Sequence, residues 1–320
     1  MTGSAVHAPA RLDDIDSAYH PAWGRQSRSP LVNKLHGASL MFRAGWLVRQ
    51  ILRSLPASVW DRVLPYVVDA AGERAKFRAG VPTVGGLLQN LQHNGFQPQT
   101  VIDIGANVGD WSRAAAALFS SSRFLMVDAN PDNEEHLRAA QRDIPKSNYV
   151  IQLLGAEHRD AVRFHVMGSG SSVFPEVTSF ERRRTELGMT TLDELIKKVP
   201  VPGPALMKLD VQGYELEILR GGNQALEWSE VVILEIALIT YNEGAPLFAE
   251  LVKFMDDAGF VVYDFCGQSR RCSDHALFQT DVVFVKNTSE LRKRRKFLSH
   301  EPELPPSPLN APPADWAERD

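Results

Sequence analysis

The chain has 320 residues, a formal net charge of −4 and a hydrophobic share of 44%. This apolar share is ordinary for a globular protein and argues against general disorder, and the weak net acidity gives no indication of a nucleic-acid partner. Its two cysteines, Cys266 and Cys272, are too few for a disulfide framework and lack zinc-site spacing. No apolar stretch reaches the ~18–20 residues of a membrane-spanning helix. The N-terminal residues also lack the apolar core of a secretory signal, so a cytoplasmic location is expected.

Two segments precede the main predicted domain. Residues 1–30 are polar, contain three prolines and are expected to form a flexible arm. Residues 31–95 are predicted to be a helical extension, because apolar side chains recur on one side at helical spacing. These apolar residues are Leu40, Phe42, Trp46, Leu47, Ile51, Leu52 and Leu55. We expect this extension to pack on the main domain, with a weak contact to a membrane surface or a lid over the substrate as the alternatives.

The main domain is predicted over residues 96–290. Short strands rich in Val, Ile and Leu alternate with amphipathic helices, which indicates a mainly parallel α/β sheet covered on both faces. The predicted strands are 100–104, 124–127, 149–154, 162–166, 205–209, 231–236, 260–265 and 281–285. The predicted helices are 111–119, 132–142, 191–198, 215–220 and 246–258. The tail, 291–320, begins with a basic run and continues as a proline-rich segment that we expect to be disordered.

A glycine turn follows the first predicted strand. Gly105 and Gly109 lie in the segment VIDIGANVGD and give the spacing G-x-x-x-G. Dinucleotide sites use G-x-G-x-x-G, so this turn favours S-adenosylmethionine over NAD. The carboxylate of an amino-acid moiety can meet backbone N–H groups at the start of the following helix. Asp103, at the end of the strand, is expected to face the ammonium group of that moiety.

Asp128 ends the second predicted strand, about 20–25 residues beyond the glycine turn. A carboxylate at this position is the expected acceptor for a ribose diol, because its two oxygens match two adjacent hydroxyls. The glycine turn and Asp128 together predict a nucleoside cofactor. An NAD-dependent oxidoreductase or epimerase is the rival interpretation, and the missing G-x-G-x-x-G counts against it.

A second dense segment, MKLDVQGYELEILRGG, follows the predicted strand 205–209. Asp210 ends this strand and is expected to project from the carboxyl edge of the sheet, where ligands bind in open α/β folds. Glu235 lies near the end of the predicted strand 231–236 and is expected at the same edge.

These segments resemble the FkbM family of methyltransferases. The matching pieces cover about residues 98–286 and read VIDIGANVGDWS, VDANP, GSGSSVF, TTLDEL, LMKLDVQGYELEILRGG, VVILEI and DVVFV. The resemblance implies a Rossmann-like class I methyltransferase sheet, mainly parallel with one antiparallel strand near the C-terminus, to which the N-terminal helical extension is added. It also implies methyl transfer from S-adenosylmethionine to an oxygen of the acceptor, a hydroxyl of a sugar, glycolipid or related metabolite.

The resemblance assigns roles to individual residues. The methionine part of the cofactor would be lined by Asp103, Gly105, Asn107 and Gly109. The ribose would be held by Asp128, and Asp210 would lie near the transferred methyl group. Gln212 stands where the family often has Glu, so position 212 is not expected to supply the essential base.

A sugar hydroxyl is a weak nucleophile and needs a base as it attacks. Asp210 is the first candidate for this base and Glu235 the second, and a divalent metal held by the pair is the less favoured alternative. Tyr241 and His275 are candidate contacts to the acceptor, with ordinary loop positions as the alternative. We expect a small-molecule or glycan acceptor as the partner. A non-catalytic binding module of the same fold is a further rival, and the sequence leaves the oligomeric state open.

Overall fold

The structure, a computed structural model, describes residues 83–175, 182–199, 202–271 and 273–293. The predicted arm 1–30, the apolar helical pattern between Leu40 and Leu55, Cys272 and most of the tail 291–320 lie outside these residues. The described part of the extension 31–95 contains α4 (Val84–His93), which begins where the Thr83 side chain accepts a hydrogen bond from the Gly86 N–H. None of the helices in the described ranges is long and apolar enough to cross a membrane.

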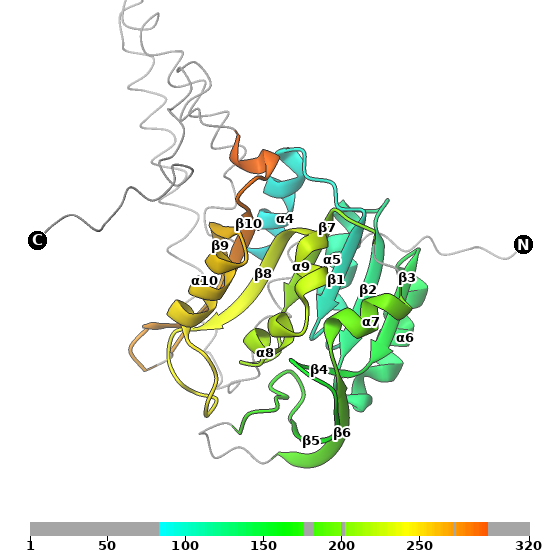
Figure 1. Ribbon diagram of the computed structural model, residues 1–320, viewed down its shortest axis with the longest axis vertical. Coiled ribbons are helices and arrows are strands. Elements are labelled where there is room, and N and C mark those ends of the chain that lie inside the picture. The colour runs from blue at the N-terminus through cyan, green and yellow to red at the C-terminus, as the bar shows by residue number, and fades with distance from the viewer. Residues whose placement is uncertain (1–82, 176–181, 200–201, 272, 294–320) are drawn as a thin grey trace, which may run out of the picture. The chain divides into compact units, whose positions relative to one another are not determined.

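A seven-stranded sheet forms the centre of the domain, in the order β3-β2-β1-β7-β8-β10-β9. Neighbouring strands from β3 to β8 run parallel, whereas β10 runs antiparallel to both β8 and β9 (Figure 1). This confirms the mainly parallel sheet with one antiparallel strand. The strands are β1 (Thr100–Ile104), β2 (Arg123–Asp128), β3 (Ser147–Ile151), β7 (Ala205–Leu209), β8 (Ser229–Ala237), β9 (Phe260–Arg270) and β10 (Leu277–Lys286).

Helices cover both faces of the sheet, because side chains alternate between the two faces along each strand. On β1, Val101 packs in one apolar cluster and Ile102 in the other. The Val101 cluster includes side chains from α4, α5 (Asp110–Leu118) and α6 (Glu134–Asp143). The Ile102 cluster includes side chains from α7 (Leu192–Lys198), α8 (Glu215–Arg220), α9 (Asn223–Trp228) and α10 (Phe248–Asp257). Helix α9 was not predicted from the sequence.

A second, three-stranded sheet lies beyond the carboxyl edge of the central sheet (Figure 1). Its strands are β4 (Leu153–Leu154), β6 (Arg183–Thr190) and β5 (Arg159–Val166), in that order. The predicted strand 149–154 is therefore divided between β3 and β4, in two different sheets. Strand β6 was not predicted, because its sequence RRTELGMT carries charged side chains where a buried strand would be apolar.

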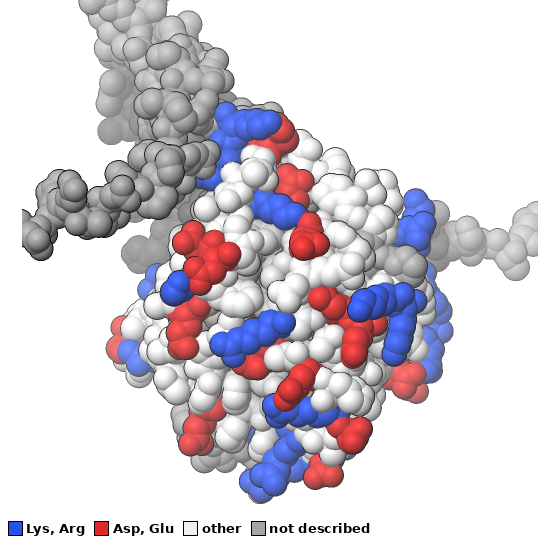
Figure 2. Space-filling model, in the orientation of Figure 1, with Lys and Arg blue, Asp and Glu red and all other residues white. Residues whose placement is uncertain are grey.

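Charged side chains of both signs share the surface. On the face shown in Figure 2, Lys and Arg are interspersed with Asp and Glu. Two such pairs lie on helices of this side, Lys253 with Asp257 at 2.8 Å on α10 and Arg220 with Glu217 on α8. Exposed pairs of this kind contribute little to stability. We therefore attribute the stability of the domain mainly to the two apolar clusters.

The topology brings the predicted polar residues to one edge. Because β1, β2, β7 and β8 are parallel, their carboxyl ends lie together. Gly105 follows β1, Asp128 ends β2, Asp210 follows β7 and Glu235 lies near the end of β8. Four residues from distant parts of the sequence thus lie at the carboxyl edge of the sheet.

Candidate active site

The turn after β1 depends on glycine at two positions. Gly105 has φ +80 and Gly109 has φ +83, both in the left-handed region. A Cβ at Gly105 would lie 1.8 Å from the Asp210 carbonyl oxygen, and one at Gly109 would lie 2.6 Å from Ala140 Cβ. The first glycine lets the turns after β1 and β7 close against each other. The second lets α5 start against α6.

Asp128 is buried and holds the neighbouring turns with its carboxylate. Its Oδ2 accepts the Asn107 N–H at 2.7 Å, and its Oδ1 accepts the Asn130 N–H at 2.8 Å and Asn133 Nδ2 at 3.2 Å. A carboxylate has about four acceptor positions, so about one remains, on Oδ2. Burial raises the pKa of Asp128, against the lowering effect of these donors. The carboxylate thus has room for one additional hydroxyl, where the sequence argument assigned it two.

A crevice opens beside Asp128 at the edge of the sheet. Its polar lining includes Gly105, Asn107, Asp128 and Asp210. Apolar side chains from β4, β5 and the turn after β7 complete the wall, namely Leu153, Leu154, Phe164 and Val211. Gly168, Ser169 and Ser171 of the GSGSS loop also line the crevice.

Asp103 lies below this crevice and is not among its lining residues. It is 0% exposed, and its Oδ2 accepts a hydrogen bond from Ser112 Oγ at 2.6 Å. Burial raises the pKa of Asp103, although the Lys208 ammonium opposes that rise. The structure therefore places Asp103 under the glycine turn, and its predicted contact with an ammonium group stays a prediction.

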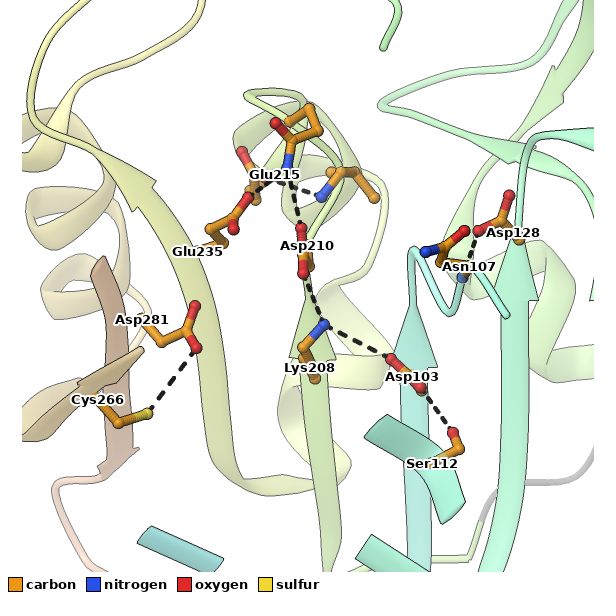
Figure 3. Close-up of polar contacts among 12 residues, drawn as sticks. Asp103, Asn107, Ser112, Asp128, Lys208, Asp210, Glu215, Glu235, Cys266 and Asp281 are labelled. Atoms are coloured by element: carbon orange, nitrogen blue, oxygen red, sulfur yellow. Dashed lines mark hydrogen bonds and ion pairs between the residues drawn. The ribbon is translucent and has the colours of Figure 1, made fainter. Parts of the chain in front are cut away.

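Lys208 is a buried charge that the sequence analysis missed. Its Nζ lies 3.0 Å from Asp210 Oδ2, 3.9 Å from Asp103 Oδ1 and 5.6 Å from the centre of the Trp111 ring. Figure 3 shows the ammonium between the two carboxylates, of which Asp210 lines the crevice. A lysine inside the apolar run Ala205–Leu209 was the available signal, since a buried ammonium requires an anionic partner.

Asp210 and Glu235 form a pair through the side chain of Gln212. Gln212 Nε2 donates to Asp210 Oδ1 at 3.2 Å and to Glu235 Oε2 at 2.6 Å. Burial alone would raise the pKa of Asp210, but the Lys208 ammonium and the hydrogen bonds from Glu235, Lys208 and Gln212 outweigh it and lower that pKa. Burial and the Asp210 charge raise the pKa of Glu235 well above its usual range. The surroundings therefore favour the ionised form of Asp210 and the protonated form of Glu235.

Two further buried acids lie near this pair. Glu215 Oε1 accepts the backbone N–H groups of Val211 at 3.0 Å and Gly213 at 3.2 Å, and burial raises its pKa to about 7. Asp281 lies opposite Glu235 on β10, and burial raises its pKa to about 8. Glu215 thus fixes the turn that carries Gln212, while Asp281 adds a carboxyl behind Glu235.

The two predicted acceptor contacts differ in their surroundings. Tyr241 is half-buried after β8, and burial raises its pKa. Its neighbour Asn242 is buried and donates from Nδ2 to the Gln212 carbonyl at 2.8 Å. His275 is exposed in the turn between β9 and β10, where its backbone N–H donates to the Arg271 carbonyl at 2.9 Å. The structure brings Tyr241 close to the acids, but neither Tyr241 nor His275 is among the crevice residues.

No group of three or more His, Cys, Asp or Glu side chains in the described ranges is arranged to hold a metal ion. The Asp210–Glu235 pair instead has Gln212 and Lys208 as polar neighbours.

The methyltransferase FkbM domain matches residues 103–262, half of the chain. The chain belongs to the FkbM methyltransferase family. One relative with a similar sequence is a hexuronic acid methyltransferase, AglP, from Haloferax volcanii. It is 27% identical over 176 residues, which cover 50% of this chain and 68% of the relative.

Solved structures give looser likenesses to this FkbM methyltransferase. A putative O-methyltransferase from Klebsiella pneumoniae has a TM-score of 0.39 and 13% identity, over 76% of this chain and 95% of that one. A fibrillarin from Aeropyrum pernix, solved with natively bound S-adenosyl-L-methionine, has a TM-score of 0.38 and 12% identity, over 62% of this chain and 74% of that one.

The crevice of this FkbM methyltransferase fits the S-adenosylmethionine that the family uses. One acceptor position on Asp128 Oδ2 suits a ribose hydroxyl, and apolar side chains of β4 and β5 offer a surface for a base. Gly105 and Asn107 border the crevice at the turn after β1. The protein is therefore an S-adenosylmethionine-dependent methyltransferase.

Proposed function

We propose that this methyltransferase transfers the methyl group to a hydroxyl oxygen of a sugar or glycolipid. The observation that carries the proposal is the Asp210–Glu235 pair, joined by Gln212 Nε2 at 3.2 and 2.6 Å, of which Asp210 lines the crevice. A sugar hydroxyl needs a base as it attacks, and an ionised carboxylate at the edge of the cofactor crevice can be that base. The name of the relative, a hexuronic acid methyltransferase, supports a sugar acceptor.

The residues around the crevice have separate tasks in this proposal. Asp128 Oδ2 accepts a ribose hydroxyl, and Gly105 and Asn107 border the methionine part of the cofactor. Gly109 and Asp103 act from below by shaping the start of α5, where Ser112 holds the Asp103 carboxyl. When bound, S-adenosylmethionine supplies an electrophilic methyl group on sulfur, so the protein needs only to position the acceptor and remove its proton.

Asp210 takes the proton of the acceptor hydroxyl while that oxygen forms its bond to the methyl carbon. Bound S-adenosylmethionine would supply the methyl group and keep the electron pair of the bond to sulfur, so Asp210 needs to accept only the hydroxyl proton. Glu235 keeps its proton and donates a hydrogen bond to Asp210, which holds the base in place. Tyr241 contacts acceptor hydroxyls from the loop after β8, and His275 contacts the more distant part of a large acceptor.

A hexuronic acid has hydroxyls and a carboxylate that could each accept the methyl group. The charge of Asp210 favours a hydroxyl as the acceptor. A carboxylate is already ionised, needs no base and would meet repulsion from Asp210. The experiment is transfer of a labelled methyl group onto glycans that contain uronic acid, followed by mild alkali. We expect alkali-stable label, since an ether survives and an ester is hydrolysed. Release of the label by alkali would overturn the proposal for a hydroxyl acceptor.

The NAD-dependent rival is tested on the same protein. A ligand that binds only the folded state raises the melting temperature. We expect S-adenosylhomocysteine to raise the melting temperature and NAD to leave it unchanged. Turnover in the labelled-methyl assay would in addition exclude a non-catalytic binding module.

A further inference from the structure

Gln212 has an unusual backbone for its residue type. Its φ is +56, in the left-handed region that a residue with a Cβ seldom adopts. Such conformations persist only where the surrounding structure holds them, and they cluster at functional sites.

Two loops hold the backbone of Gln212 at this conformation. Its carbonyl oxygen accepts hydrogen bonds from Ser172 Oγ at 2.9 Å and from Asn242 Nδ2 at 2.8 Å. Both donors are buried, at 1% and 3% exposure. Ser172 follows β5 and Asn242 follows β8, so segments from the cofactor side and the acceptor side meet at one carbonyl.

The side chain of Gln212 uses this fixed backbone to reach both acids. Its amide group has two N–H donors, and Nε2 lies within hydrogen-bond distance of Asp210 and of Glu235. The amide carries no charge, so it brings the two carboxyls together without adding a third titrating group. The other titratable or charged groups that act on this pair are Lys208 on β7, Asp103 on β1, Asp128 on β2, Glu215 on α8, Tyr241 after β8 and Asp281 on β10.

We propose that Gln212 is a positioning residue for methyl transfer: it holds Asp210 and Glu235 as one proton-sharing pair and so sets the pH range in which Asp210 is an active base. The inference rests on the proposed function, since it assumes that Asp210 is the base. Gln212 acts through the two acids and contacts neither substrate nor cofactor in this role.

Three substitutions of Gln212 distinguish the role of its side chain from that of its backbone. Gln212→Gly and Gln212→Asn both suit a positive φ, so they remove or shorten the amide without straining the turn. Gln212→Glu keeps the length and adds a third acid to the pair. Gln268→Glu makes the same chemical change on an exposed residue of β9 and is the matched control.

The first readout is the pH dependence of kcat together with the affinity for S-adenosylhomocysteine. In Gln212→Glu we expect the acid limb of kcat to move to higher pH, because a third acid disfavours the ionised form of Asp210. In Gln212→Gly and Gln212→Asn we expect kcat to fall roughly 10–100-fold, because the base is no longer held in place. Affinity for S-adenosylhomocysteine and melting temperature should stay near those of Gln268→Glu.

A second readout does not depend on turnover. Carboxyl-carbon NMR of protein labelled in Glu follows the protonation of Glu235, with Glu235→Gln identifying the signal. We expect its titration to shift in all three Gln212 variants and to stay unchanged in Gln268→Glu. Unchanged Glu235 titration with an unchanged kcat profile would overturn the role of Gln212. A wild-type protein that methylates no hydroxyl, yet shows the NMR shift, would overturn the proposed acceptor and leave the coupling of the two acids established.

Discussion

Asp128→Asn tests how the crevice holds the cofactor, because the change removes a charge and alters few atoms. In the proposal, the last acceptor position on Oδ2 receives a ribose hydroxyl. A hydrogen bond to a charged group contributes about 1.5–3 kcal/mol. Its loss corresponds to an affinity roughly 10–150-fold lower.

The same substitution also disturbs the protein itself. An Asn side chain places an NH2 group either against the Asn107 N–H or against the donors of Asn130 and Asn133. A buried donor without an acceptor costs about 1–3 kcal/mol of stability. The free energy of unfolding should therefore fall along with the affinity.

Calorimetric titration with S-adenosylhomocysteine gives the affinity, and urea denaturation gives the free energy of unfolding. Asp143→Asn is the matched control, since Asp143 is exposed at the end of α6 and pairs with Arg113 at 2.9 Å. The control should bind like the wild type. A folded Asp128→Asn protein with undiminished affinity would refute the reasoning and leave Asp128 as an acid that only fixes two turns.

Three further predictions concern the acids and the buried lysine. Asp210→Asn should lower kcat about 10²–10⁴-fold, because the base is lost, while S-adenosylhomocysteine binds with near wild-type affinity in calorimetry. Lys208→Met should lower the free energy of unfolding by about 3–5 kcal/mol in urea denaturation, because it leaves the Asp103 and Asp210 carboxylates without their buried cation. Glu215 has a folded-state pKa of about 7, raised from 4.5, so its stabilising contribution is complete below about pH 4.5 and is lost as pH rises through 7. Glu215→Gln can keep both backbone hydrogen bonds on Oε1 and should flatten this pH dependence in denaturation curves measured from pH 4.5 to 7.5.

Each of these predictions has a result that contradicts it. Full activity of Asp210→Asn would show that another group is the base, and Glu235 would then be the first candidate. A Lys208→Met protein as stable as the wild type would show that Asp103 and Asp210 can become protonated without lowering the free energy of unfolding. An unchanged slope in Glu215→Gln would assign the pH dependence to other buried acids, of which Asp281 is the first.

The sequence predicts most of the central sheet because its strands are buried on both faces. Such strands appear as short apolar runs, and Val231–Ile236 lies wholly within β8. Strand ends in a parallel sheet share one edge, so Asp128 and Asp210 could be expected near each other from their positions alone. Strand β6 was not predicted because its sequence RRTELGMT is largely polar and charged, and in the structure its Glu186 lies opposite Arg163 of β5.

The remaining features of the site come from contacts between distant segments. Lys208 and Asp103 are paired in register by the crossover that places β7 beside β1, and no local pattern contains that pairing. The sequence marked Gln212 only as a position where the family often has Glu. Its hydrogen bonds to Asp210, which follows β7, and to Glu235 on β8 depend on these two strands lying side by side, so the sequence did not predict them. The three donors that occupy Asp128 likewise come from two separate turns, so its remaining capacity could be found only in the structure.

The most direct test of the account is a crystal structure of the full chain with S-adenosylhomocysteine. The account predicts a ribose hydroxyl within hydrogen-bond distance of Asp128 Oδ2 and the sulfur atom on the side of the crevice that faces Asp210. An adenosyl group bound elsewhere, or a sulfur atom directed away from Asp210, would contradict it.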